Sequence, residues 1–132
     1  MEGAMTEPMK QHGAFSWHEL VTTDVEAAKN FYMKLFGWTT EEVAMGGMNY
    51  VVVKAGGEDA GGIMAMPPQA KGAPPHWGLY VTVDDVDATA KLAEKMGARI
   101  IVPPKDIPDV GRFCLFQDPQ GAFLSAITYF HP

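Results

Sequence analysis

Two stretches of the chain carry apolar residues at the three-and-four spacing of an amphipathic helix. They are residues 23–38, TDVEAAKNFYMKLFGW, and residues 84–99, DDVDATAKLAEKMGAR. This spacing places the apolar side chains on one face of each helix, and we expect that face to cover a sheet. In chain order these residues are Val25, Ala28, Phe31, Tyr32, Leu35 and Phe36, then Val86, Ala90, Ala93 and Met96.

Both predicted helices have start and stop signals. Thr23 and Asp84 stand where an N-cap is expected, and each is followed three places later by an acidic residue, as in a capping box. Gly37 and Gly97 stand where a left-handed residue would end each helix. The two segments therefore follow one design.

Runs rich in aromatic and branched residues surround the helices and predict strands. One run precedes each helix and three follow it, with turns expected at Gly46-Gly47, at residues 58–61 (EDAG) and at residues 118–121 (DPQG). The pattern is therefore β-α-β-β-β, repeated once. The predicted strands are residues 15–22, 38–43, 48–55, 61–66, 76–83, 98–102, 111–117 and 122–129.

This repeat predicts an α+β fold made of two βαβββ modules. We expect a flexible N-terminal segment at 1–14, a first module at 15–66, a proline-rich linker at 67–75 and a second module at 76–130. One helix covers only one face of a four-stranded sheet, so the second face must be covered by the other module or by a ligand. We therefore expect two curved mixed sheets that face each other around a cleft.

Composition narrows the class of partner. The 132 residues carry 16 acidic and 10 basic side chains, a formal net charge of −6, which argues against nucleic-acid binding and favours a small molecule or a protein. The N-terminus does not read as a secretory signal, and no apolar run reaches the length of a membrane span. The single cysteine, Cys114, favours a reducing compartment, so we expect a cytoplasmic protein with an inert, buried thiol.

The strings WHELVTTDVEAAKNFYMKLFGW and PPKDIPDVGRFCLFQDPQGAF, set in two βαβββ modules, resemble the vicinal oxygen chelate superfamily of glyoxalases, extradiol dioxygenases and bleomycin-resistance proteins. The resemblance is nearest to glyoxalase-like bacterial proteins and implies a small-molecule cleft. It also implies a homodimer, and a lactoylglutathione-lyase-like or dioxygenase-related activity with a divalent ion such as Zn, Ni, Fe or Mn. No nucleotide-binding loop or serine-hydrolase elbow is present.

The metal positions implied by the resemblance lack suitable side chains. The first-strand position lies seven residues before the helix-initial Asp, which gives Trp17 and, in the second module, Gly78. The last-strand position gives Ser125 in the second module, while residues 61–66 of the first module contain no acid or imidazole. We therefore expect no standard metal site.

The adjacent His18 and Glu19 cannot replace those ligands as a pair, because neighbouring strand side chains point to opposite faces. Parity places Glu19 on the face of Trp17, the cleft face in this family, while His18 packs beside the helix or lies partly exposed. Glu19 is our candidate general base, with His76 or Tyr80 nearby. The alternative is a structural carboxylate bound by Arg112, Tyr80 or a backbone amide.

Further residues are candidate ligand contacts, with core packing or a solvated surface as the alternative for each. Trp17 and Met64 could line an apolar pocket, and Lys105, Asp106 and Arg112 lie on a loop near the expected cleft mouth. The expected ligand-binding residues are Trp17, Met64, His76, Tyr80, Arg112 and Ser125.

Three functions stay open from the sequence. The chain could be a metal-free protein that sequesters a drug or metabolite, as bleomycin-resistance proteins do. It could be an enzyme that uses Glu19 as a base without the usual metal site. It could also be a domain that binds other proteins.

Overall fold

A computed structural model describes residues 5–45, 48–67 and 73–130 of the chain. Within it, two compact units form, one of residues 18–78 and one of residues 1–17 with 79–132. The predicted turn at Gly46-Gly47 and residues 68–72 of the predicted linker lie outside the described residues.

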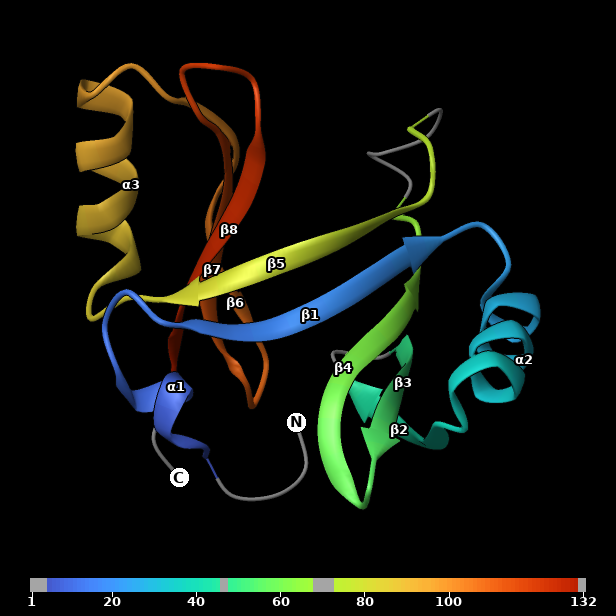
Figure 1. Cartoon of the computed structure of the whole chain (residues 1–132). Helices are drawn as coiled ribbons and strands as arrows, with labels where there is room; N and C mark the ends of the chain where they lie inside the picture. The colour runs from blue at the N-terminus through green and yellow to red at the C-terminus, as the bar shows by residue number, and fades with distance from the viewer. Residues whose placement is uncertain (1–4, 46–47, 68–72, 131–132) are drawn as a thin grey trace. The chain divides into compact units, whose positions relative to one another are not determined.

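The first β-α-β-β-β series has its strands in the order β2-β3-β4-β1 (Figure 1). β1 pairs with β4 in parallel, while β2 with β3 and β3 with β4 are antiparallel. The elements are β1 (Phe15–Thr22), α2 (Val25–Phe36), β2 (Thr39–Met45), β3 (Met48–Ala55) and β4 (Glu58–Ala65).

The second series repeats this arrangement, with strands in the order β5-β8-β7-β6 and a parallel β5–β8 pair. The repeated α+β design predicted from the sequence is therefore confirmed, and in Figure 1 α3 lies along one side of the β6–β8 strands. The elements are β5 (His76–Thr82), α3 (Val86–Lys95), β6 (Arg99–Ile107), β7 (Gly111–Gln117) and β8 (Phe123–Tyr129).

A helix covers one face of each set of strands. In the first set, the buried residues of that face contact α2 through Val25, Ala28 and Tyr32. In the second set, Val86 and Ala90 of α3 join the core. Outside the helices, the buried residues of these cores are Leu20, Val51, Val53 and Ile63 in the first, and Val83, Cys114 and Ala126 in the second.

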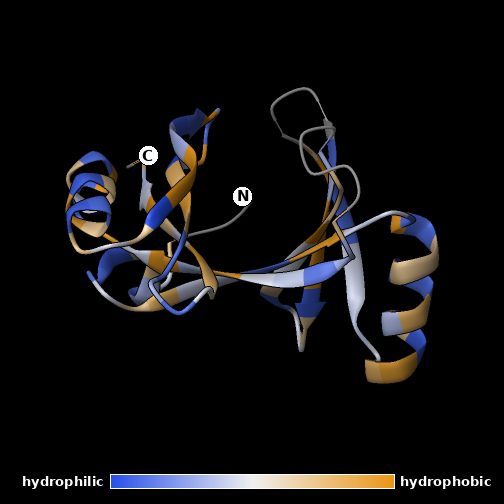
Figure 2. Cartoon of the chain, turned by 90° about the horizontal axis from the view of Figure 1, so that it is seen from above, coloured by the Kyte–Doolittle hydropathy of each residue, from blue (hydrophilic) through white to orange (hydrophobic). Residues whose placement is uncertain are grey.

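The predicted helical faces are only partly covered. Phe31, Leu35 and Phe36 of α2 are 57–58% exposed, and Met96, one residue beyond the end of α3, is 70% exposed. The expectation that all these residues face a core is wrong. Figure 2 shows hydrophobic positions of α2 among hydrophilic ones.

The helix caps lie one residue later than predicted. The Asp24 carboxylate accepts a hydrogen bond from the Ala27 amide at 3.0 Å, and Asp85 accepts one from Ala88 at 3.2 Å. A cap carboxylate must reach the amide three residues onward, and the helices begin at Val25 and Val86. Thr23 and Asp84 are therefore not the caps.

The helix ends agree better with the sequence. Gly37 has φ 71° and Gly97 has φ 100°, both left-handed as predicted. Other boundaries differ by a residue: β2 begins at Thr39, β5 ends at Thr82 and β8 begins at Phe123.

The β3–β4 turn was predicted at residues 58–61, and this is wrong. The turn is Gly56-Gly57, with φ 60° and 83°, and residues 58–60 already belong to β4. Two consecutive positive φ angles form a two-residue hairpin loop that suits the twist of its strands, and glycine adopts them without strain. A bulge after Val53 then shifts the pairing with β4.

β6 is longer than predicted, because residues 103–107, expected in a loop, continue the strand. Pro103 and Pro104 are tolerated here since β6 is the last strand in its order, and the pairing with β7 shifts between Val102 and Lys105. Lys105 and Asp106 therefore lie on a strand.

The expected flexible N-terminal segment contains a short helix, α1 (Glu7–Lys10). Pro8 near its start and Glu7 in its first turn favour that helix. The segment also pairs with β5: the Gly13 amide donates to the Thr82 carbonyl at 2.7 Å, and the Thr82 amide donates to Ala14 at 2.8 Å. The Thr82 hydroxyl donates to the Pro8 carbonyl at 2.8 Å.

Candidate functional site

Glu19 on β1 is bound by a tyrosine that the sequence analysis did not select. The Tyr50 hydroxyl donates a hydrogen bond to Glu19 Oε2 at 2.7 Å. Tyr50 lies on β3 and is 3% exposed, whereas Glu19 is partly exposed. A phenol bound to a carboxylate makes a charge-assisted hydrogen bond, which fixes the orientation of the acidic group.

Gly62 makes this contact possible. β4 lies between β1 and β3, and Gly62 pairs with Glu19 on one side and with Val52 on the other. A Cβ at position 62 would collide with the ring and hydroxyl of Tyr50. The Tyr50 ring therefore crosses β4 through the space that any other residue at position 62 would fill.

The side chains around Glu19 and Tyr50 lie on the face of the strands opposite α2. Residues two apart along a strand share a face, so Glu19, Val21, Gly62, Met64, Tyr50 and Val52 project to one side. Leu20, Val51 and Ile63 project to the other side, toward α2. Parity therefore placed Glu19 on the correct side of the sheet.

The strand registers identify the fourth metal position. Glu19 pairs with Gly62 in the β1–β4 pair, and Tyr80 pairs with Ser125 in the equivalent β5–β8 pair. Gly62 is therefore the counterpart of Ser125. The resemblance implies Trp17, Gly78 and Ser125 as positions for a divalent ion, and the register adds Gly62 from residues 61–66 as the fourth.

This donor set does not fit a metal ion. Trp17 carries an indole, the two glycines have no side chain to coordinate an ion, and Ser125 carries a hydroxyl. Even an open catalytic zinc site keeps three protein ligands. Within residues 5–45, 48–67 and 73–130, no group of three or more His, Cys, Asp or Glu side chains could hold an ion.

Tyr80 and Ser125 lie together in the second set of strands. They are direct partners across β5 and β8, each is 9% exposed, and the Tyr80 ring lies 6.2 Å from that of Phe113. Trp17 of β1 is 6% exposed. These three predicted contacts are mostly buried, and a role in ligand binding for them stays a prediction.

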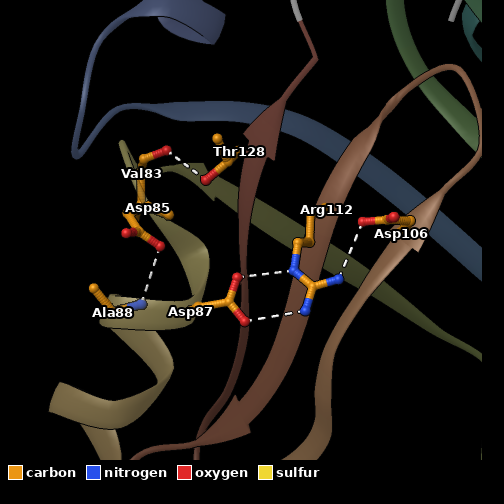
Figure 3. A network of polar contacts seen from close by, with 7 residues as sticks. All are labelled: Val83, Asp85, Asp87, Ala88, Asp106, Arg112 and Thr128. Carbon is orange, nitrogen blue, oxygen red and sulfur yellow. Dashed lines mark hydrogen bonds and ion pairs between the residues drawn. The ribbon is translucent and has the colours of Figure 1, made fainter.

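Arg112 lies on the other face of that sheet, in a network that joins β7 to α3 and β6 (Figure 3). Its guanidinium donates two hydrogen bonds to Asp87 at 2.8 and 3.0 Å and one to Asp106 at 3.1 Å. These hydrogen bonds hold α3 against the strands. We therefore leave Arg112 out of the proposed site.

The same network changes two pKa values. The Arg112 hydrogen bonds hold the pKa of Asp87 below its usual value, and the two carboxylates raise the pKa of Arg112. Both groups are therefore ionised at neutral pH. The network of Figure 3 also includes the cap hydrogen bond of Asp85 and the hydroxyl of Thr128, which donates to the Val83 carbonyl at 2.8 Å.

The histidines and Met64 make simpler contacts. His76 is exposed, and its Nδ1 lies 3.0 Å from the Pro74 carbonyl oxygen. His18 is exposed, with Nδ1 3.1 Å from the Ala60 carbonyl oxygen, and it points away from the Glu19 face. Met64 is partly exposed and pairs with Val21, one step along the strands from Glu19 and Gly62.

Cys114 is fully buried in the second core, as predicted. Burial raises the pKa of its thiol, so the reactive thiolate is disfavoured. The prediction of a buried thiol is confirmed.

Comparison with known proteins points to one family. The model of the glyoxalase/bleomycin resistance protein/dioxygenase superfamily matches residues 14–125. The chain is 42% identical over 120 residues to "Putative glyoxylase CFP32" of Mycobacterium tuberculosis, covering 90% of this chain and 45% of that protein. It is 32% identical over 123 residues to "Anthracycline biosynthesis protein DnrV" of Streptomyces peucetius, covering 83% of this chain and 45% of that protein.

The chain thus spans less than half the length of these two relatives. A "Glyoxylase-like domain-containing protein" of Didymella fabae is 30% identical over 120 residues, covering 86% of this chain and 91% of that protein.

Solved structures share the fold. Methylmalonyl-CoA epimerase from Mycobacterium tuberculosis has a TM-score of 0.61 at 16% identity, covering 87% of this chain and 86% of that one. The Streptomyces coelicolor epimerase has a TM-score of 0.60 at 14% identity, covering 89% and 97%. None of the helices in the described parts of the chain has the length and apolarity of a membrane span.

Proposed function

We propose that this chain, which belongs to the glyoxalase/bleomycin resistance protein/dioxygenase superfamily, binds a small organic molecule without a divalent metal ion. The binding surface we propose is the face of β1, β3 and β4 that carries Glu19 and Tyr50. The names of two relatives, a glyoxylase and an anthracycline biosynthesis protein, favour small organic molecules as the class to test.

One observation carries this proposal: Tyr50 occupies the space above Gly62. Gly62 is a position where the resemblance implies a metal ligand, and a ligand side chain there would collide with the tyrosine ring. The Tyr50 ring fills that space, and its hydroxyl donates a hydrogen bond to Glu19. The sheet face thus presents an oriented carboxylate beside the partly exposed Val21 and Met64, which is how a mostly apolar binding site obtains a polar anchor.

A ligand screen on metal-stripped protein tests the proposal. The protein is treated with a chelator, and a library of small organic molecules is screened by thermal unfolding, because a ligand that binds the folded state raises Tm. We expect ligands that raise Tm in the chelated protein, with a smaller shift in Glu19→Gln. Ligands that act only after a divalent metal is restored would contradict the proposal.

A second candidate function is metal-free catalysis with Glu19 as general base. The 2.7 Å hydrogen bond from Tyr50 favours it, because a base must be held in one orientation toward the proton that it removes. A ligand found in the screen would then be converted by the wild-type protein and only bound by Glu19→Gln. If the wild-type protein leaves the ligand chemically unchanged, catalysis is excluded for that ligand and binding is the function that remains. A lactoylglutathione-lyase-like reaction that depends on a metal is not proposed, because the donor set does not fit one.

We also propose that the protein is a cytoplasmic homodimer. The single cysteine supports a reducing compartment. The apolar residues of α2 that lie in solvent, Phe31, Leu35 and Phe36, support self-association, since large exposed apolar patches commonly mark interfaces. The expected cleft between the modules stays a prediction.

A further inference from the structure

The second set of strands has a positively charged face, although the net charge of the whole chain is −6. Asp106 and Arg112 are cross-strand partners on the side of α3, where Arg112 also binds Asp87 (Figure 3). Lys105 pairs with Phe113 at the next position along both strands, so these two side chains project to the opposite face. The lysine and the two carboxylates are thus on different sides of the sheet.

No acid of these four strands, all of whose residues are described, lies on the face opposite α3. β5, β7 and β8 contain no Asp or Glu, and the single acid of β6 is Asp106, which faces α3. Arg99 shares the face of Lys105, because its neighbour Ile100 packs into the core beneath α3. The strands therefore place two cations and no carboxylate on this face.

The two cations of this face are not engaged by acids. Lys105 and Arg99 are exposed, and neither makes a hydrogen bond or an ion pair with any residue that the structure describes. Lys29, Lys54 and Arg112, by contrast, each lie against carboxylates. The charges of Lys105 and Arg99 therefore stay available to an anion from solution.

An apolar strip lies between the two cations. Between their positions on β6, Val102 pairs with Leu115 of β7. Val102, Leu115 and Phe113 are all partly exposed. The N-terminal segment, which contains the acid Glu7, meets this sheet at Thr82 on β5, three strands away from β6. A ligand on the strip would meet an apolar surface with a positive charge at each end.

We propose that this strip binds a small organic acid, with the carboxylate on Lys105 and the apolar body on Val102, Leu115 and Phe113. Arg99 strengthens the positive potential from the other end of the strip. The ion pair is exposed to solvent, so it selects the head group while the apolar contacts supply most of the affinity. This proposal goes beyond the proposed function, because none of its residues belongs to the surface of β1, β3 and β4.

Three compounds with one apolar body and different head groups test the strip: 4-phenylbutanoate, 4-phenylbutan-1-ol and 4-phenylbutylamine. Each is titrated into the ¹⁵N-labelled full chain at low ionic strength and neutral pH, and amide shifts are followed by NMR. We expect the carboxylate to move the amides of Val102, Lys105 and Phe113 and to bind about threefold more tightly than the alcohol, as an exposed ion pair allows. The amine should bind the strip most weakly. The net charge of −6 favours the amine, so a preference for the carboxylate has to come from this face.

Variants assign the preference to Lys105. Lys105→Gln should bring the carboxylate and the alcohol close to equal binding, whereas Lys105→Arg keeps the charge and should keep the preference. Lys95→Gln is the matched control, because Lys95 is an exposed lysine at the end of α3 and its loss changes the net charge equally; the preference should persist there. Adding about 0.3 M NaCl should weaken the preference by screening. The same spectra show whether each variant is folded.

Several outcomes would overturn the proposal. They are equal binding of the three compounds, preference for the amine, no shift at the named amides, or a carboxylate preference that survives Lys105→Gln. The wild-type comparison decides without relying on any variant. If library ligands bind the chelated protein through Glu19 but the strip shows no preference for the carboxylate, this proposal fails and the proposed function stands. If the strip prefers the carboxylate but no library ligand depends on Glu19, the Glu19 surface fails and this proposal stands.

Discussion

At the scale of single residues, the absence of a side chain at Gly62 is what connects Tyr50 to Glu19. The ring of Tyr50 lies where a Cβ of residue 62 would be, and its hydroxyl reaches the carboxylate on the far side of β4. Glycine is common where another group must approach the backbone closely. Here the approaching group is a side chain from the next strand.

Gly62→Ala should therefore destabilise the fold. The added methyl group would displace the Tyr50 ring, and overpacking of this kind costs about 1–3 kcal/mol in the free energy of unfolding. Chemical denaturation monitored by fluorescence measures the loss. In the double variant with Tyr50→Ala, the total loss should be smaller than the sum of the two single losses, because the clash is gone.

Gly78→Ala is the matched control. A Cβ at position 78 has the Glu19 carbonyl oxygen as its nearest neighbour at 3.8 Å, which is an ordinary contact. Its effect should be small. If Gly62→Ala were as well tolerated as Gly78→Ala, the Tyr50 ring would not occupy the space we assign to it.

Strand parity is enough to place Glu19 on the face away from the helix, but parity cannot identify Tyr50 as its partner. The contact depends on the register of three strands, because β4 lies between β1 and β3. The pairing depends on a turn at Gly56-Gly57 and a bulge after Val53, both of which the sequence analysis missed. The sequence does hold one signal. Tyr50 lies two residues from Val52 and so shares its face, and the neighbouring strand carries two consecutive glycines, Gly61 and Gly62.

At the scale of the element, the first helix depends on Asp24. Asp24→Ala should lower the free energy of unfolding by about 1 kcal/mol, because it removes the hydrogen bond to the Ala27 amide. Thr23→Ala should cost less than about 0.5 kcal/mol, as for an ordinary surface change. Denaturation of the two variants compares them directly, and an equal or greater loss for Thr23→Ala would contradict the cap assignment.

Helix α3 is held to its strands by Arg112, and this predicts acid sensitivity. Arg112 lowers the pKa of folded Asp87 below the ordinary 3.8, so the unfolded state binds the proton more readily. The stabilisation is present above the unfolded value and is lost as pH falls through the folded value. Tm of the wild type should therefore drop below about pH 4.

Asp87→Asn should lower Tm at neutral pH, and its difference from the wild type should shrink as pH falls below the ordinary 3.8. Glu94→Gln is the control, since Glu94 is an exposed acid on the same helix. Calorimetry over this range measures all three proteins. A difference between Asp87→Asn and the wild type that stays constant with pH would show that the ion pair does not contribute.

At the scale of the whole chain, the repeat alone predicted the α+β order of elements, because helix period, cap and glycine recur in both halves. It did not predict which helical residues stay in solvent. Phe31, Leu35 and Phe36 satisfy the apolar period of α2, but only the positions that face the strands are covered. The period identifies a helix, but it does not show how much of the apolar face the strands cover.

Those exposed residues predict self-association. Light scattering after size exclusion should give twice the mass of one chain, and the double variant Phe31→Ser with Leu35→Ser should shift it toward the single-chain mass. Leu92→Ser is the control, since Leu92 is 56% exposed on α3. A wild-type protein that elutes as a monomer, or a dimer unaffected by the double variant, would contradict this assignment.

The central claim, that this member of the superfamily binds small molecules without a divalent metal ion, is tested most directly by elemental analysis. The purified protein is measured as isolated, and again after incubation with nickel, zinc, iron or manganese and removal of unbound ions. The donor set of Trp17, Gly62, Gly78 and Ser125 predicts far less than one ion per chain in every case. About one retained ion per chain would contradict the account.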